Sequence, residues 1–125
     1  MATVLDHTIV PVRNREEAVE FYNRIFGFED LGEAGPFLAV RVNDTFNLDF
    51  RDVDGFESHH YAFAMDSEEF EMAFANIRES GITYGDSPSG QENMQGPGMT
   101  LGAKGIGKAV YFKDPNGHLL EIKTY

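Results

Sequence analysis

Two histidines occupy corresponding places in a sequence that repeats itself. His7 and His60 each begin an apolar segment, and a charged, helix-like stretch follows each of them. The two halves superpose at an offset of 53 residues, the separation between these histidines, which also aligns Glu16 with Glu69. The match therefore covers a strand, a turn and a helix rather than a single dipeptide. Two imidazoles related by a repeat indicate a metal site.

Carboxylates complete the pattern. Each half ends in an apolar segment with one embedded acid, Asp49 in the first half and Glu121 in the second. An ionised carboxylate on an apolar strand is costly to bury unless it is paired or bound to a cation. The chain has no cysteine, so any metal must be held by imidazole and carboxylate. We expect His7, His60 and Glu121 to bind a divalent metal (Zn, Ni, Mn, Co or Fe(II)), with positions left open for substrate oxygens.

The elements that position these residues follow from hydrophobic periodicity. Three-and-four spacing predicts helices over 15–26 and 67–79, with Asn14 and Ser67 as N-caps and Gly27 as a C-terminal stop. Short apolar runs between turn residues predict strands. These strands are expected over 4–12, 28–33, 37–42, 46–51, 59–65, 82–85, 108–113 and 118–124. The fold class is therefore α+β, with a βαβββ order in each half.

Strand parity determines which side chains share a face, because successive side chains point to opposite sides of a sheet. His60 is in phase with the small residue Ala62, and Glu121 is in phase with Lys123. If the halves are equivalent, His7 has the same phase as His60. The bulky residues between them would pack under the helices, and the charged residues would fall together on the other face.

Residues 86–107 break the symmetry of the repeat. They contain six glycines and no hydrophobic period. A segment of this length is unusually long for a connection in a compact domain. One interpretation is a flexible surface loop. The other is a lid that closes over a ligand and offers Met94 and Met99 as adaptable apolar contacts.

Three features resemble functional motifs but are given other interpretations. Residues 102–108 have the spacing of a P-loop, but Ala109 follows the lysine and no helix is expected, so nucleotide binding is not predicted. His59 points to the face opposite His60. His118 follows an Asp-Pro-Asn-Gly turn out of phase with Glu121, and we expect it in the turn or in solvent.

Taken together, these residues resemble the vicinal oxygen chelate superfamily. The duplication, the histidine opening each half, and the segment Asp-Pro-Asn-Gly-His-Leu-Leu-Glu at 114–121 carry the resemblance. That superfamily includes glyoxalase I, extradiol dioxygenases, fosfomycin-resistance transferases and bleomycin-resistance proteins. The resemblance implies a single domain over 1–125, with modules 1–53 and 54–125 forming a curved, cup-like mixed sheet and helices on its outer face. His7, His60 and Glu121 match the metal-ligand positions of the family.

The resemblance also implies a function. The chain would be a glyoxalase-like lyase, a dioxygenase or a thiol transferase whose small substrate chelates the metal through vicinal oxygens. Asp49 would be a fourth ligand or a catalytic base, or else an exposed carboxylate or one paired with Arg41 or Arg51. Tyr111 would be an acid or hydrogen-bond donor, or else a core aromatic. The alternative function is a non-catalytic protein that sequesters a small molecule such as an antibiotic.

Composition limits the partners. The formal net charge of −11 would repel the phosphates of nucleic acids and anionic lipid surfaces. The sequence has no apolar run of transmembrane length and no signal-peptide pattern at its start, so we expect a cytoplasmic protein. Sheet edges left open by four strands per module predict a homodimer.

Overall fold

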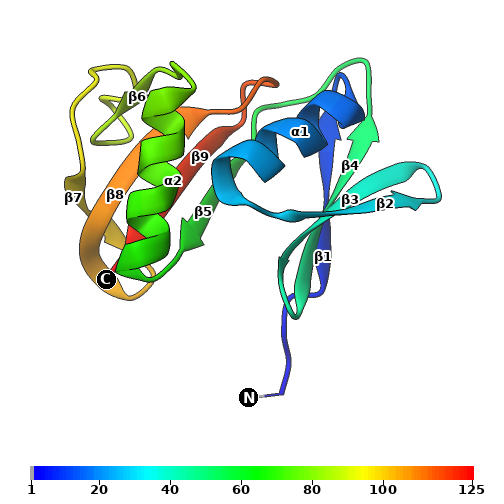
Figure 1. The fold of residues 1–125 in the computed structure, drawn as a ribbon, viewed down its shortest axis with the longest axis horizontal. Helices are drawn as coiled ribbons and strands as arrows, with labels where there is room; N and C mark the ends of the chain where they lie inside the picture. Colours follow the sequence, from blue (N-terminus) through cyan, green and yellow to red (C-terminus); the bar gives the residue numbers. More distant parts are fainter. Residues whose placement is uncertain (1) are drawn as a thin grey trace. The chain divides into compact units, whose positions relative to one another are not determined.

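The computed structural model describes residues 2–125, which form two compact units. The first unit runs through Glu57, and the second comprises residues from Ser58 onward. Each unit combines a mixed sheet with an α-helix, so the predicted α+β class is confirmed (Figure 1). Among residues 2–125, no helix is both long and apolar enough to span a membrane.

The first unit has the predicted βαβββ order. Its elements are β1 (His7–Val12), α1 (Arg15–Phe26), β2 (Glu29–Ala34), β3 (Phe37–Asn43) and β4 (Phe46–Asp52). The strands lie in the order β1-β4-β3-β2, with β1 parallel to β4 and the remaining pairs antiparallel. Asn14 caps α1 as predicted, because its side chain accepts a 2.9 Å hydrogen bond from Glu17 N. Gly27 ends the helix with φ +74°, a conformation that glycine adopts without steric cost.

The core of this unit lies between α1 and the sheet. Tyr22 and Ile25 of α1 are fully buried, and so are Leu48 and Phe50 of β4. The rings of Tyr22 and Phe50 lie 4.9 Å apart between centroids. Because side chains alternate along a strand, burial of Leu48 and Phe50 under the helix turns Asp49 toward the opposite face.

The second unit contains one strand more than predicted. Its elements are β5 (His60–Ala64), α2 (Ser67–Glu79), β6 (Tyr84–Gly85), β7 (Gly98–Gly102), β8 (Gly105–Lys113) and β9 (Leu119–Thr124). The strands lie in the order β5-β9-β8-β6, β7 pairs with β8, and α2 covers one face of the sheet (Figure 1). The predicted N-cap Ser67 is wrong. Asp66 caps α2 instead, because its carboxylate accepts a 2.8 Å hydrogen bond from Glu69 N.

The additional strand corrects the description of 86–107 as one irregular segment. β7 pairs antiparallel with the first half of β8, which begins at Gly105 rather than at 108. Close packing favours glycine in this hairpin: a Cβ on Gly102 would overlap the Tyr125 hydroxyl and the Lys123 side chain, so one of these side chains would have to move. Glycines that allow other residues to pack closely do not alternate with apolar residues. The segment therefore lacks the two-residue hydrophobic period that predicts a strand.

Candidate functional site

The strongest grouping of predicted site residues lies between the first and last strands of the second unit. β5 and β9 are parallel neighbours, with Ala62 opposite Glu121 in the register. His60 Nε2 lies 3.3 Å from Glu121 Oε1. The carboxylate side chain is only 7% exposed, whereas the imidazole is 48% exposed. The predicted phase of His60 and Glu121 therefore matches the structure, and their side chains meet.

The imidazole of His60 is oriented by the backbone. Its Nδ1 lies 3.0 Å from the Leu119 carbonyl oxygen, which can only accept, so Nδ1 carries the proton. The lone pair of a neutral ring then lies on Nε2, facing Glu121 Oε1. Two acceptor atoms this close repel each other, and a proton or a cation shared between them stabilises the contact.

The separation of this pair is compatible with a metal ion bound between the two side chains. Ligand atoms about 2.1 Å from a metal, at tetrahedral or octahedral angles, lie about 3.0–3.4 Å from each other. The separation of 3.3 Å between His60 Nε2 and Glu121 Oε1 falls in that range. A ring N–H held by a carbonyl group is also the usual support of a metal-binding histidine.

His7 has a similar arrangement in the first unit. Its Nδ1 lies 2.6 Å from Asp6 Oδ2, which leaves Nε2 available as a ligand. The hydrogen bond to Asp6 raises the pKa of His7, and the charge of Asp49 adds to the increase. His7 and Asp49 share a face, because β1 and β4 pair in parallel with Ile9 opposite Asp49. Arg41, one predicted partner of Asp49, contacts Glu29 instead.

The predicted metal ligands are thus distributed over both units. Within the described part of the chain, residues 2–125, no three His, Cys, Asp or Glu side chains gather closely enough to hold a metal ion. The structure brings His60 and Glu121 together in one unit and places His7 beside Asp49 in the other. The complete set of His7, His60 and Glu121 stays a prediction.

Tyr111 combines the two roles considered for it. It lies on β8 directly opposite Glu121 in the register and is 2% exposed. Its hydroxyl is 2.8 Å from Thr100 Oγ1 and also hydrogen-bonds to Glu121. Burial raises the pKa of Tyr111, the bond from Thr100 partly offsets this, and the negative Glu121 raises it again. The phenol is therefore a core aromatic that also donates to the site.

Lys123 is a site residue whose burial was not predicted from the sequence. It is 2% exposed, and its Nζ donates to Thr100 O at 2.8 Å and to Thr100 Oγ1 at 2.9 Å. Nζ also lies 3.5 Å from Glu121 Oε2. An ammonium only donates and a carboxylate only accepts, so Thr100 must donate to Tyr111 and Tyr111 to Glu121. These four side chains form a closed ring of interactions, the Lys123–Thr100–Tyr111–Glu121 ring.

A cavity of about 290 Å³ opens beside this ring. Its polar wall consists of His60, Glu121 and Lys123. The remaining lining is small or apolar and comprises Ala62, Ala64, Leu101, Gly102, Ala103 and Tyr125. The alanines in phase with His60 leave open space next to the imidazole, as their size predicts. A small organic molecule with one polar edge would match this lining.

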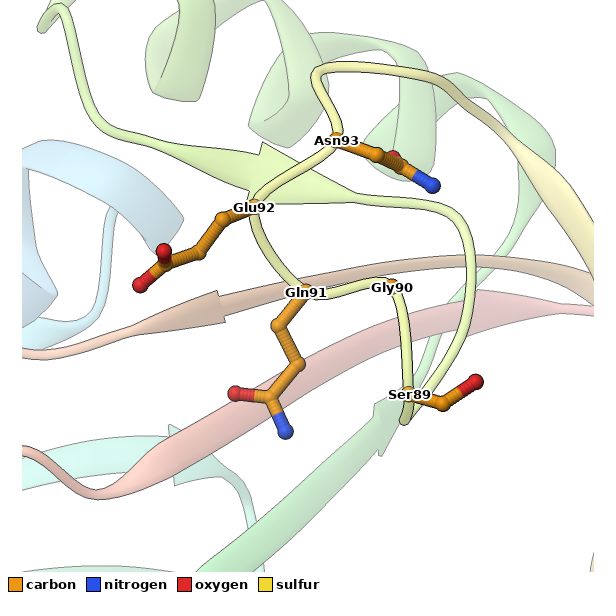
Figure 2. A pocket seen from close by; sticks show the side chains of 5 residues that line it. All are labelled: Ser89, Gly90, Gln91, Glu92 and Asn93. Carbon is orange, nitrogen blue, oxygen red and sulfur yellow. The ribbon is translucent and has the colours of Figure 1, made fainter.

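A second, open hollow of about 370 Å³ lies in the loop before β7, lined by Ser89, Gly90, Gln91, Glu92 and Asn93 (Figure 2). The Gln91 and Glu92 side chains extend away from the loop backbone in Figure 2. Asn93 Nδ2 donates to Asp86 Oδ1 at 2.8 Å, within the same loop. No histidine contributes to the lining, so the hollow is a poor match for metal chemistry.

The two remaining histidines of the second unit form a separate cluster. His59 Nδ1 lies 2.6 Å from the Tyr61 hydroxyl, on the face opposite His60 as predicted. Of the two places expected for His118, the turn or solvent, solvent is wrong, because its side chain is fully buried next to the turn. Its Nδ1 accepts a 2.9 Å hydrogen bond from His59 N, and its ring packs on His59. Burial and the charge of Asp114 raise the pKa of Tyr61 to about 12.

Comparisons with known proteins find relatives over nearly the whole chain. Residues 4–122 match the family model described as Glyoxalase/Bleomycin resistance protein/Dioxygenase superfamily. The metallothiol transferase FosB of Shouchella clausii (strain KSM-K16) is 27% identical, over 99% of this chain and 82% of its own length. The structure of the oxidase ChaP-H2 has a TM-score of 0.85 and 34% identity, covering 100% of this chain and 95% of its own. The fosfomycin resistance protein FosX of Listeria monocytogenes has the same fold, with a TM-score of 0.71 and 20% identity over 100% of this chain and 95% of its own.

Proposed function

The chain belongs to the glyoxalase/bleomycin resistance protein/dioxygenase superfamily, and from this premise we propose that it is a divalent-metal-dependent enzyme. Its substrate would be a small molecule that chelates the metal through two neighbouring oxygens. His7, His60 and Glu121 would hold the metal. As a Lewis acid, a bound divalent metal stabilises negative charge that develops on coordinated substrate oxygens.

The approach of His60 Nε2 to Glu121 Oε1 at 3.3 Å is the observation that carries this proposal. Nδ1 of the same ring is held by the Leu119 carbonyl, which leaves Nε2 for a cation. Nδ1 of His7 is similarly held by Asp6. Such support of the second ring nitrogen orients a histidine and raises its strength as a ligand.

Two further residues receive roles in the proposed reaction. Asp49 lies on the same face as His7 and is our choice for a base that removes a substrate proton or for a fourth ligand. Tyr111 donates to Glu121 and interacts with Thr100, and it does not line the cavity. We therefore assign Tyr111 to orient Glu121 rather than to transfer a proton itself.

Oxidation is the reaction we favour. The oxidase ChaP-H2 shares 34% identity over the whole chain, and the apolar walls of the cavity would suit a ring that carries two adjacent oxygens. Thiol transfer is the second candidate, supported by the metallothiol transferase relative at 27% identity. The sequestering alternative is less well supported, because a protein that only binds a small molecule has no need of the oriented His60–Glu121 pair.

We also propose that the active form is a homodimer. β1 ends the sheet of the first unit and β5 ends that of the second. Open edges of this kind are usually covered, and a second copy of the chain is the simplest cover. Light scattering that gives a monomeric mass at micromolar concentration would contradict this assembly.

A metal analysis of protein purified without chelator tests the proposed function. We expect about one divalent metal per chain, and oxygen uptake with a vicinal diol substrate after loading with Fe(II). Transfer of a thiol to a small organic substrate with Mn(II) would favour the second candidate. Glu71→Gln, on the surface of α2, is the control for nonspecific binding by an acidic protein. Failure to bind any of Zn, Ni, Mn, Co and Fe(II) more tightly than a surface carboxylate would reject a metalloenzyme.

A further inference from the structure

The two oxygens of Glu121 face different partners. Oε1 lies 3.3 Å from His60 Nε2, whereas Oε2 lies 3.5 Å from the Nζ of Lys123. Both Glu121 and Lys123 are almost completely buried. The carboxylate is therefore held between an imidazole on one side and an ammonium group on the other.

The position of the ammonium is determined by its surroundings. Two of its three N–H donors are used by Thr100 O and Thr100 Oγ1, and the third can reach Gly107 O at 3.4 Å or Glu121 Oε2. The lysine stem packs so closely on β7 that a Cβ on Gly102 would overlap it. Lys123 is thus not a flexible surface lysine that can move away from the carboxylate.

A carboxylate can bind a metal through one oxygen or through both. We propose that Lys123 is a positioning residue that holds Oε2 of Glu121 and so keeps Glu121 a one-oxygen ligand. One coordination position then stays open for a substrate oxygen. This inference rests on the proposed metal-dependent function and adds to it a residue that does not itself bind the metal.

The charge of Lys123 has a second effect, which determines whether metal affinity should rise or fall when the lysine is replaced. An ammonium near the site repels a divalent cation, so its removal favours metal binding. Its removal also frees Oε2 to bind the same cation. A variant without this charge should therefore bind metal more tightly while leaving fewer positions for water or substrate.

Lys123→Met, which keeps the length of the stem and removes the charge, tests the proposal with Mn²⁺ as the probe. Because the repelling charge is removed, we expect Mn²⁺ affinity to rise about tenfold by isothermal titration. Water-proton relaxation should show about one fewer exchangeable water on the bound Mn²⁺. Lys104→Met is the matched control, because Lys104 lies in the exposed turn between β7 and β8. It should bind Mn²⁺ as wild type does.

Thr100→Val provides a second route if Lys123→Met does not fold, as judged by circular dichroism. It removes one acceptor of the ammonium, and a smaller change in the same two measurements is expected. Wild-type protein that binds none of Mn²⁺, Zn²⁺, Ni²⁺, Co²⁺ and Fe²⁺ would reject the proposed function itself. Wild type that binds Mn²⁺, with unchanged hydration in the folded variant, would overturn only the role of Lys123. A lysine with a purely structural role would lower the melting temperature without changing the hydration of bound Mn²⁺.

Discussion

His60 Nε2 and Glu121 Oε1 lie 3.3 Å apart, although they come from the first and last strands of the second unit. The parallel pairing of β5 and β9 produces this approach, since it places Glu121 opposite Ala62. A small residue at 62 leaves the space in which the imidazole and the carboxylate meet. The backbone of β9 also contributes, because the Leu119 carbonyl holds the other nitrogen of the ring.

Variants of His59 and His60, which lie on opposite faces of the sheet, should separate the effect on metal binding from the effect on stability. His60→Ala should lower metal affinity by about 100-fold or more and change the free energy of unfolding by less than about 0.5 kcal/mol, since the ring is half exposed. His59→Ala should leave the metal affinity unchanged and cost about 1 kcal/mol, because Tyr61 loses its hydrogen-bond partner. Metal titration and urea unfolding of both variants check this. Equal metal affinity in the two variants would contradict the assignment of His60.

Glu121→Gln should weaken metal binding and also reduce stability. The amide retains the size of the side chain but loses the negative charge that faces both His60 and Lys123. We expect the free energy of unfolding to fall by about 1–3 kcal/mol, less than for a fully unpaired buried charge, since Thr100 still binds Lys123. The double variant Glu121→Gln/Lys123→Met should regain part of that loss. A folded Glu121→Gln protein with wild-type metal affinity would disprove the ligand role.

Close packing of the β7–β8 hairpin can be tested with two glycines. Gly102→Ala should lower the free energy of unfolding by about 1–3 kcal/mol, because the new methyl group overlaps Tyr125 and Lys123. Gly55→Ala is the control, since no atom lies within 4 Å of its added Cβ. It should change stability by less than about 0.5 kcal/mol. Urea denaturation is the measurement, and similar values for both variants would argue against the tight hairpin.

Alkaline titration should reveal Tyr61. Its pKa in the folded protein is about 12, above the ordinary value of 10.0, so the folded state favours the neutral phenol. The resulting stabilisation is complete below pH 10 and is lost as the pH rises toward 12. The ultraviolet absorbance of tyrosinate should show a late step near pH 12 whose amplitude falls by one tyrosine in Tyr61→Phe and is unchanged in Tyr125→Phe. A late step of undiminished amplitude in Tyr61→Phe would assign it to another tyrosine.

Local patterns were sufficient to predict much of the fold. The helix over 15–26 matches α1 at both ends, because its apolar spacing, the Asn14 cap and Gly27 all favour the same boundaries. The extra strand β7 was missed because its sequence reflects contacts with residues distant in the chain. Gly102 packs closely against Tyr125 and Lys123, and the hydrophobic pattern of the local sequence gives no sign of that contact.

In the site, too, local features could be predicted from the sequence and contacts between distant residues could not. Strand parity placed Lys123 on the face of Glu121, but its burial depends on acceptors in β7, an element that was not predicted. Because His118 follows a turn, the sequence predicts it in the turn or in solvent, yet its side chain is fully buried, and its partners include the backbone of His59 just before β5. Parity in a strand is a local property, whereas burial of a polar side chain depends on which distant groups satisfy its hydrogen bonds.

The Lys123–Thr100–Tyr111–Glu121 ring has a direction, since each hydroxyl receives from one neighbour and donates to the next. Replacing a single member leaves a donor or an acceptor without its complement in a buried place, so the four positions should evolve as one inherited unit. Homologous sequences that lack a lysine at 123 are expected to lack the hydroxyl at 100 as well. Substitutions in β7 and β9 would then be correlated among homologues, although these two strands have no backbone pairing with each other.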